Sequence, residues 1–368
     1  IIKKLPILES VFYNKGDEGL KAVYNLGNAQ VVDEEVHDNG ITIRFTEVYY
    51  DDLRFSVAYE IKLPEKQEVT MDTLSFFMDA NTYINGEKVQ LSGGTGMSNE
   101  DLPYIRGVMD LDVLADKMGE EFDFTIEIFE VNNIKGKWKF NFPVSKVNGL
   151  SSPTKFISSD NLGNGMEVKN LVVTPSGVQT SVKFKESIKE NKSSEELKYF
   201  ITEGNGIWRE ASNQTTIHEA RESYIEKFEE YYIKEDVLFP PISDKNGHFS
   251  ILPAKQVESK IQQYPLRHGE VIKYNEYGSF EITKIQQSEG NLEVIIDIHQ
   301  NSKFIPVNYI YITSKDYSFI YSMNDMQKIG NHQYQLMIPT NIESSDLLVE
   351  FTMLEPFLDL AVNGLVDN

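Results

Sequence analysis

The sequence predicts a mainly all-β protein, built from tandem immunoglobulin-like or fibronectin-like β-sandwich domains with a few short helices. Short runs of alternating apolar and polar residues recur along the chain, separated by turn residues, and this pattern is typical of strands with one buried face. Aromatic residues make up 11% of the chain and, with Val, Ile and Thr, favour strands. A length of 368 residues suits about two to three domains.

The first expected elements are two short helices between residues 7 and 26, where apolar residues at helical spacing are interrupted by "NKGDEG". The second, "DEGLKAVYNLG", has an acidic start and a glycine stop. From Ala29 the period changes to two. The segment "DNGITIRFTEVYYDDLRFSVAYEI" (Asp38–Ile61) then reads as two strands joined by a turn at Asp51-Asp52.

This hairpin pattern recurs twice, in "GNGMEVKNLVVTPSGVQTSVKF" and in "EYGSFEITKIQQSEGNLEVIIDI". In each copy a glycine (Gly40, Gly165, Gly278) precedes the first strand, and a polar turn follows roughly ten residues later. The spacing suits tandem domains of one size. With "SKVNGLSSPT" as a linker, we predict an N-terminal segment plus β-sandwich over 1–147, a β-sandwich-like middle domain with a partly helical insertion over 148–268, and a C-terminal immunoglobulin-like β-sandwich over 269–368.

Further strands are expected in the first and third domains. The candidates are Leu74–Met78, Tyr83–Val89 with an Asn-Gly turn, Tyr104–Asp110, Glu121–Val131, Gly136–Val144, Val307–Thr313, Tyr317–Ser322, Tyr334–Ile338 and Leu347–Leu354. The segment Asp112–Glu120 reads as one helical turn.

The middle domain is less regular and holds an insertion over 186–238. Within "TTIHEARESYIEKFEEYYIKED", apolar residues at helical spacing favour an amphipathic helix, with a strand through "EEYYIKED" as the alternative. A further short helix is expected in "PAKQVESKIQQYP".

Composition excludes several function classes. A net charge of −22 repels phosphate backbones and anionic membranes, so nucleic-acid binding is not expected. We interpret the negative charge as a contribution to solubility. The alternative roles are weak attraction of cations and electrostatic spacing from an anionic cell wall. Since there is no cysteine, disulfides, thiolate metal sites and Cys nucleophiles are excluded. This absence fits a bacterial protein outside the cytoplasm.

No pattern of catalytic, cofactor-binding or metal-ligating residues appears, and none is predicted. The histidines are read as surface or structural residues, because none has a zinc-ligand spacing: His37, His218, His248, His268, His299 and His332. The Gly-rich segment Leu91–Asp101 lacks the lysine of a phosphate-binding loop and reads as a flexible connection, with a ligand loop as the alternative.

Acidic and tryptophan residues give the remaining candidates. Two acidic groups are incomplete as calcium loops and read as solvated carboxylates, with a bound cation as the alternative: Asp110, Asp112 and Asp116, and Asp244 with Asn246. Trp138 alternates with phenylalanines and reads as a core residue, whereas Trp208 is open to either a core or a sugar-stacking role.

Three segments resemble a Gram-positive family of unknown function: "LPILESVFYNKGDEGLKAV", "DNGITIRFTEVYYDDLRFSVAYEI" and "FDFTIEIFEVNNIKGKWKFNFPV". Its members are single-pass membrane proteins that resemble anti-sigma regulators, are often encoded beside extracytoplasmic-function sigma factors, and commonly carry a following immunoglobulin-like domain of unknown function. The resemblance covers about the first 145 residues well. It supplies no catalytic residues.

The resemblance implies an extracytoplasmic region that is anchored by an N-terminal helix outside this chain. The start "IIKKLPILESVF" then reads as a cut behind that anchor, and alternatively as an ordinary hydrophobic element docked on the first domain. We therefore expect a non-enzymatic sensory or protein-interaction role linked to envelope-stress regulation. The alternatives are a surface module that binds a cell-wall polymer or a protein, and a hydrolase on a β-sandwich scaffold.

Overall fold

The computed structural model describes residues 10–64, 80–90, 93–98, 104–113, 117–131, 133–152, 155–187, 197–203, 207–211, 213–217, 230–242, 248–256, 261–288 and 290–365. By its contacts the chain forms two compact units. Unit 1 comprises Ile1–Ser151 and Val172–Val178, and unit 2 comprises Ser152–Leu171 and Gln179–Asn368. Antiparallel sheets predominate, and the predicted mainly all-β, multidomain fold is confirmed. The division into three domains stays a prediction.

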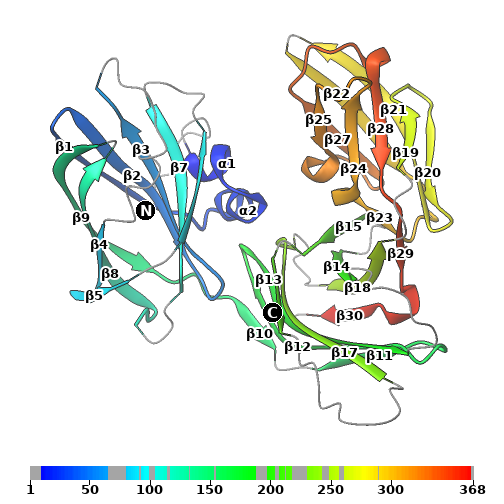
Figure 1. Cartoon of the computed structure of the whole chain (residues 1–368), viewed down its shortest axis with the longest axis horizontal. Coiled ribbons are helices and arrows are strands. Elements are labelled where there is room, and N and C mark those ends of the chain that lie inside the picture. The colour runs from blue at the N-terminus through cyan, green and yellow to red at the C-terminus, as the bar shows by residue number, and fades with distance from the viewer. Residues whose placement is uncertain are drawn as a thin grey trace. The chain divides into compact units, whose positions relative to one another are not determined.

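The described residues of unit 1 form two antiparallel sheets (Figure 1). The first has the order β1-β2-β3-β7-β6, with β1 (Gln30–Asp38), β2 (Ile41–Tyr50), β3 (Phe55–Lys62), β7 (Tyr104–Leu111) and β6 (Gly93–Ser98). The second has the order β5-β4-β8-β9, with β5 (Glu87–Val89), β4 (Asn81–Ile84), β8 (Glu121–Val131) and β9 (Ile134–Ser145). One core cluster joins residues of both sheets, which makes the unit a β-sandwich.

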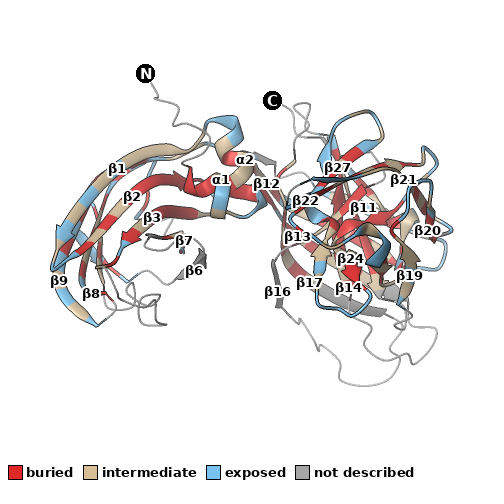
Figure 2. Cartoon of the chain, turned by 90° about the horizontal axis from the view of Figure 1, so that it is seen from above, coloured by how far each residue is buried: buried red, intermediate tan, exposed pale blue. Residues whose placement is uncertain are grey.

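The core of unit 1 is rich in aromatic side chains. Phe45 of the first sheet packs edge-on against Phe140 of the second, with ring centroids 4.6 Å apart. Trp138 is fully buried, and its indole N–H donates to the carbonyl of Ile41 at 3.2 Å, as the predicted core role requires. In Figure 2, buried residues mark much of the length of β2 and β3.

Two short helices cover the other face of the first sheet. They are α1 (Val11–Lys15) and α2 (Glu18–Leu26), and both were predicted. The side chains of Ser10 and Asp17 cap their N-termini, and α2 ends at Gly27, whose φ of 73° is left-handed. Their apolar residues form a second cluster with residues of β2, β3 and β7.

A β-bulge decides which side chains of β2 face the helices. The register between β2 and β3 shifts between Phe45 and Glu47, so Thr46 is an extra residue. Before the bulge, odd-numbered residues of β2 face the sandwich core, and after it Val48 and Tyr50 do. The bulge therefore turns Glu47 and Tyr49 towards the helix-covered face.

The predicted recurring hairpin is present in all three places. It corresponds to β2–β3, to β12 (Gly165–Thr174) with β13 (Gly177–Ser187), and to β21 (Gly278–Ser288) with β22 (Asn291–Ile298). The preceding glycines serve different purposes. Gly40 has a φ of 82° and follows Asn39 in the tight turn between β1 and β2, whereas a Cβ on Gly278 would collide with the carbonyl oxygen of Phe304.

The described residues of unit 2 form four sheets, and three of them hold strands from the predicted middle region; in the third, only residues 262–265 come from it. One has the order β10-β12-β13-β17-β16, and β11 also pairs with β12; its further strands are β10 (Leu150–Ser152), β11 (Phe156–Ser159), β16 (Asn213–Ile217) and β17 (Glu230–Phe239). Another has the order β23-β15-β14-β18-β29, and β30 also pairs with β18; its strands are β14 (Leu197–Thr202), β15 (Ile207–Glu210), β18 (His248–Gln256), β23 (Ile305–Pro306), β29 (Leu354–Pro356) and β30 (Val362–Leu365).

The other two sheets of unit 2 form a second sandwich. Their orders are β19-β28-β24-β25 and β20-β21-β22-β27-β26, with β19 (Gln262–Pro265), β20 (Val271–Asn275), β24 (Ile310–Ser314), β25 (Ile320–Ser322), β26 (Gln327–Lys328), β27 (Gln333–Ile338) and β28 (Leu347–Phe351). Short 3-10 turns lie at Val307–Tyr309, Met323–Asp325, Ser344–Asp346 and Leu358–Leu360. One core cluster spans these sheets and extends to residues of β14, β15 and β18.

Several local predictions need correction. In the segment predicted as a short helix from Pro253, residues 253–256 complete β18, which pairs with β14 and β29, and residues 262–265 form another strand; residues 257–260 lie outside the described residues. The Gly-rich segment Leu91–Asp101, predicted as a flexible connection, contains the strand β6, which pairs antiparallel with β7. Residues 230–239 form the strand β17. This corresponds to the alternative prediction, a strand through "EEYYIKED", and not to the amphipathic helix.

Other predictions fall wholly or partly outside the described residues. The predicted strand Leu74–Met78 lies wholly outside them. Residues 218–229 of the predicted amphipathic helix and residues 114–116 of the predicted helical turn Asp112–Glu120 also lie outside them.

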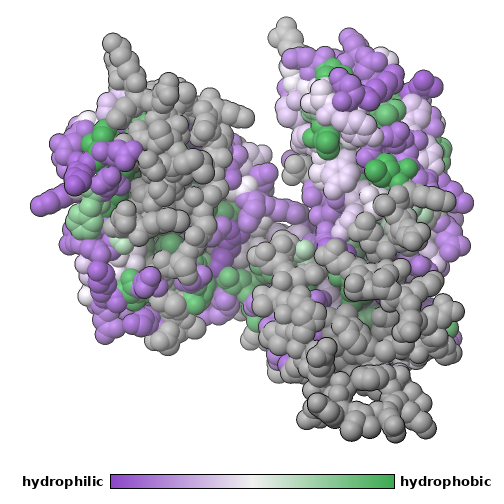
Figure 3. All heavy atoms as spheres, in the orientation of Figure 1, coloured by the Kyte–Doolittle hydropathy of each residue, from purple (hydrophilic) through white to green (hydrophobic). Residues whose placement is uncertain are grey.

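On the face drawn in Figure 3, hydrophilic residues predominate and hydrophobic ones form small, separate spots. Among the described residues, no helix has the length and apolar character that crossing a membrane requires.

Candidate functional site

Two of the predicted surface or structural histidines contact a neighbouring hydroxyl group. The ring Nδ1 of His37 lies 2.9 Å from the hydroxyl of Thr42, and His299 has a similar contact with Ser279 at 2.8 Å. The described residues contain no group of three or more His, Asp or Glu side chains placed to hold a metal ion. His218, Asp116, Asp244 and Asn246 lie outside those residues.

Asp110 belongs to an ion-pair network in unit 1. Its carboxylate accepts a hydrogen bond from the Arg54 guanidinium at 2.6 Å and another from the Ser56 hydroxyl. The same guanidinium donates to Asp17 at 2.9 Å. Asp110, predicted as a solvated carboxylate, is thus partly exposed and ion-paired with Arg54, whose guanidinium lies where a bound cation would contact it.

Trp208 is a core residue and offers no exposed face for a sugar. It is 5% exposed, its indole N–H donates to the carbonyl of Lys303 at 2.7 Å, and its ring packs against Phe304 with centroids 6.1 Å apart.

Glu47 is a buried acidic side chain of β2 that faces α1. It is 1% exposed and accepts hydrogen bonds from the Ser10 hydroxyl at 2.9 Å and from the backbone N–H of Phe12 at 3.0 Å. Burial raises the pKa of this carboxyl against the opposing effect of these hydrogen bonds. The arrangement ties α1 to β2, so the group has a structural role.

Asp51 is fully buried at the turn of the first hairpin. One carboxylate oxygen accepts from the backbone N–H groups of Leu53 and Arg54 at 2.7 and 2.8 Å, which fixes the turn as predicted. The other accepts from the hydroxyls of Tyr49 and Ser176, each at 2.6 Å. Ser176 belongs to the segment Val172–Val178 of unit 1. All these partners are internal, so this site too is structural.

A pocket of about 460 Å³ lies in unit 2 and combines aromatic and charged side chains. It is lined by residues of β19 and β20, of the turn after β20, of the short link between β28 and β29, and of β29: Gln262, Tyr264, Lys273, Tyr274, Glu276, Tyr277, Met353, Leu354 and Glu355. Its volume lies within the usual range for small-ligand sites.

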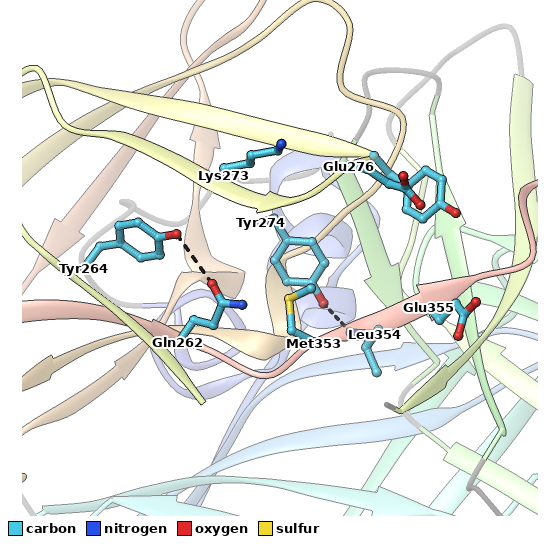
Figure 4. Close-up of a pocket in the computed structure, with 9 residues that line it drawn as sticks. Gln262, Tyr264, Lys273, Tyr274, Glu276, Met353, Leu354 and Glu355 are labelled. Atoms are coloured by element: carbon cyan, nitrogen blue, oxygen red, sulfur yellow. Dashed lines mark hydrogen bonds between the residues drawn. The ribbon is translucent and has the colours of Figure 1, made fainter. Parts of the chain in front are cut away.

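Tyr274 forms the rigid floor of this tyrosine pocket (Figure 4). It is fully buried; its hydroxyl donates to the carbonyl of Thr352 and accepts from the N–H of Leu354, both at 2.9 Å. Burial raises the pKa of this hydroxyl. The ring of Tyr264 stacks nearly parallel on Phe351, with centroids 5.8 Å apart. Packing therefore fixes both rings before any ligand arrives.

The two ends of the pocket differ in charge. Gln262 and Tyr264 lie on one side of Tyr274, and Glu276 and Glu355 lie on the other (Figure 4). Both glutamates are exposed. A hydrogen bond to Glu276 is the largest cause that raises the pKa of Tyr277, and the negative charges of Glu355 and Asp359 add to it. The pocket thus has an acidic end.

Sequence reasoning missed these pocket residues. Three tyrosines lie within fourteen residues, from Tyr264 to Tyr277, but their alternation with polar residues is equally typical of a strand. The third wall, at 353–355, is remote in the sequence and joins the site through the pairing of β19 with β28 and through the hydrogen bonds of Tyr274 with Thr352 and Leu354.

Comparisons with known proteins give a family match for the N-terminal part only. Residues 1–63 match the model of a domain of unknown function (DUF4179). These residues include α1, α2 and β1–β3, and they cover two of the three segments that carry the resemblance. The match supports an unknown-function family and assigns no activity.

The remaining comparisons add no function. No curated protein matches the sequence. One similar solved structure is a conserved domain protein from Bacillus anthracis, at 13% identity and a TM-score of 0.40, over 64% of this chain and 81% of that one. A score at this level does not establish a shared fold.

Proposed function

We propose that this chain is a non-enzymatic binding region that works outside the cytoplasm of a Gram-positive bacterium, as the sensory or protein-interaction part of a membrane-anchored, anti-sigma-like regulator. The tyrosine pocket is the observation that carries the binding role. Its rings are fixed by packing and hydrogen bonds, while its charged groups lie at an exposed rim. A preformed aromatic site with accessible charges suits recognition.

Composition and resemblance support the location and the regulatory role. The chain has no cysteine and a net charge of −22, which fits an extracytoplasmic bacterial protein and disfavours nucleic acid as a partner. The match of residues 1–63 to a domain of unknown function agrees with the first part of the resemblance. In this proposal, ligand binding outside the cell changes the state of an inner segment that lies beyond this chain.

Location and regulation can be tested in the native host. A chromosomal copy with a C-terminal epitope tag is exposed to added protease in intact cells, and we expect the tag to be lost. Protection until the cells are broken would contradict the extracytoplasmic location. Deletion of the gene should raise transcription from promoters of the neighbouring sigma factor, and unchanged transcription would contradict the regulatory role.

A second candidate function, a hydrolase, is favoured by one observation. Glu276 and Glu355 line the same pocket, and two carboxylates can serve as general acid and general base. Incubation of the protein with oligosaccharides and peptides, followed by mass spectrometry, tests this alternative. Products that disappear in the Glu276→Gln variant would support a hydrolase. Intact probes are expected if the site only binds.

A further inference from the structure

We propose that the acidic end of the tyrosine pocket binds the side chain of a lysine or arginine in an extended peptide segment. This inference rests on the binding role proposed above and names the ligand of that site. It is drawn from charge, aromatic geometry and the position of the pocket in the sheets.

Charge complementarity selects a cation. The lining holds two carboxylates, Glu276 and Glu355, against one ammonium, Lys273, and Asp359 adds negative charge beside Tyr277. The whole chain carries −22, so the long-range field also attracts basic segments. An anionic polymer would meet repulsion both at the rim and at a distance.

The tyrosines make a bare ion a poor fit and an organic cation a good one. Tyr277 is half-buried beside Glu276, and Tyr264 is half-buried at the other end. The faces of such rings attract ammonium and guanidinium groups, and their edges pack against the methylene stem of a lysine or arginine. Met353 and Leu354 add apolar wall for that stem.

The strand positions favour a peptide over a free amine. β19 and β20 each stand at an end of their sheet order, so one side of each strand has no strand partner among the described residues. A peptide in extended conformation can pair with such an edge and place alternate side chains in a pocket. β20 is the better template, because Pro265 in β19 has no N–H to donate. The pocket volume exceeds a single side chain and leaves room for neighbouring residues.

The experiment titrates the full chain with blocked pentapeptides by NMR or calorimetry. The probe is VTKTV, VTRTV is its guanidinium counterpart, and VTQTV and VTETV are matched controls without the positive charge. We expect VTKTV and VTRTV to bind about tenfold more tightly than VTQTV. We expect VTETV to bind most weakly of the four, and added salt to reduce the preference for the positively charged peptides.

Three variants test the assignment of the site. Glu276→Gln combined with Glu355→Gln should weaken VTKTV binding about tenfold and leave VTQTV binding unchanged, since each exposed ion pair contributes a factor of up to about five. Tyr277→Ala should weaken VTKTV and VTRTV. The matched control is Glu343→Gln, which removes an exposed charge outside the lining and should change nothing. Near-ultraviolet circular dichroism checks that each variant folds.

Each outcome decides between this inference and the proposed function. Equal affinity for VTKTV and VTQTV, or no binding of any peptide, overturns the ligand assignment. Binding of tri-N-acetylglucosamine in place of the peptides also overturns it, but leaves the non-enzymatic binding role standing. Cleavage of a bound peptide overturns the non-enzymatic role instead.

Discussion

Replacement of Glu47 tests whether buried polar contacts hold α1 on the first sheet. The carboxylate accepts from the Ser10 hydroxyl and from the backbone N–H groups of Phe12 and Val11. Glu47→Ala removes every one of these acceptors from a site that is 1% exposed. Glu47→Gln keeps the shape and one acceptor oxygen, and its amide can donate to the hydroxyl of Ser10.

The magnitude follows from the donors that lose their partner. The serine hydroxyl can turn towards another acceptor, but the two backbone N–H groups cannot. Each unsatisfied buried donor costs about 1–3 kcal/mol, and removal of a buried charge offsets part of this cost. We expect Glu47→Ala to lower the free energy of unfolding of unit 1 by about 2–4 kcal/mol and Glu47→Gln by less than about 1 kcal/mol.

The same residue gives a pH dependence with a definite sign. Burial raises the pKa of Glu47 in the folded state above its unfolded value. The folded state therefore holds more protons in the window between the two values, and its stability falls as pH rises through that window, by at most about 1.4 kcal/mol per pH unit. The contribution is fully present below the unfolded pKa. Glu47→Gln should abolish it.

The assay follows unfolding of unit 1 by tryptophan fluorescence in urea. The chain contains two tryptophans, and in a Trp208→Phe background the emission comes from Trp138, which lies in the core of unit 1. The difference in unfolding free energy between wild type and Glu47→Gln is measured from pH 4 to pH 8. Equal losses for the Ala and Gln variants, or a pH-independent difference, would refute the reasoning.

Three further predictions concern single contacts. Ser176→Ala removes a buried hydrogen-bond donor and should cost unit 1 about 1–3 kcal/mol in the same urea assay, and an unchanged midpoint would count against it. Gly278→Ala forces a methyl group against the backbone and should destabilise unit 2 by about 1–3 kcal/mol, which a thermal melt would show as a lower Tm; an equal Tm would argue against the close approach. Hydrogen bonds from Ser314 and Ser318 lower the pKa of Asp316 to about 2, so a carbon-13 NMR titration should show a midpoint there. The stability from this ionised carboxylate is present above its unfolded pKa and is lost as pH falls through the folded value. Ser318→Ala should raise the midpoint, and a wild-type midpoint at the ordinary carboxyl value would contradict the contacts.

Much of the secondary structure could be predicted from the sequence, because alternation and turn residues are local signals. The recurring hairpin, the two capped helices and the Asp51 turn followed from such patterns. The bulge at Thr46 did not, since an extra residue in one strand is defined only by its partner. The inward position of Glu47 depends on that bulge, so simple alternation could not predict it.

The candidate site could not be predicted, because its walls meet only through sheet pairing. Gln262 and Tyr264 lie in a strand, whereas the sequence predicted a short helix there. The segment "PAKQVESKIQQYP" is compatible with both the helical and the strand spacing of apolar residues. Pairing with β28 decides in favour of the strand, and hydrogen bonds between the hydroxyl of Tyr274 and the backbone of Thr352 and Leu354 place the third wall beside that ring. Long-range pairing of this kind overrides local propensity.

The most direct test of the tyrosine pocket as the binding site is hydrogen exchange with bound VTKTV, followed by mass spectrometry of proteolytic fragments. We predict slower exchange in fragments that contain residues 262–277 and 353–355, and weaker protection there at the same peptide concentration in the combined Glu276→Gln and Glu355→Gln variant. Bound peptide with protection confined to fragments outside those residues would contradict the account.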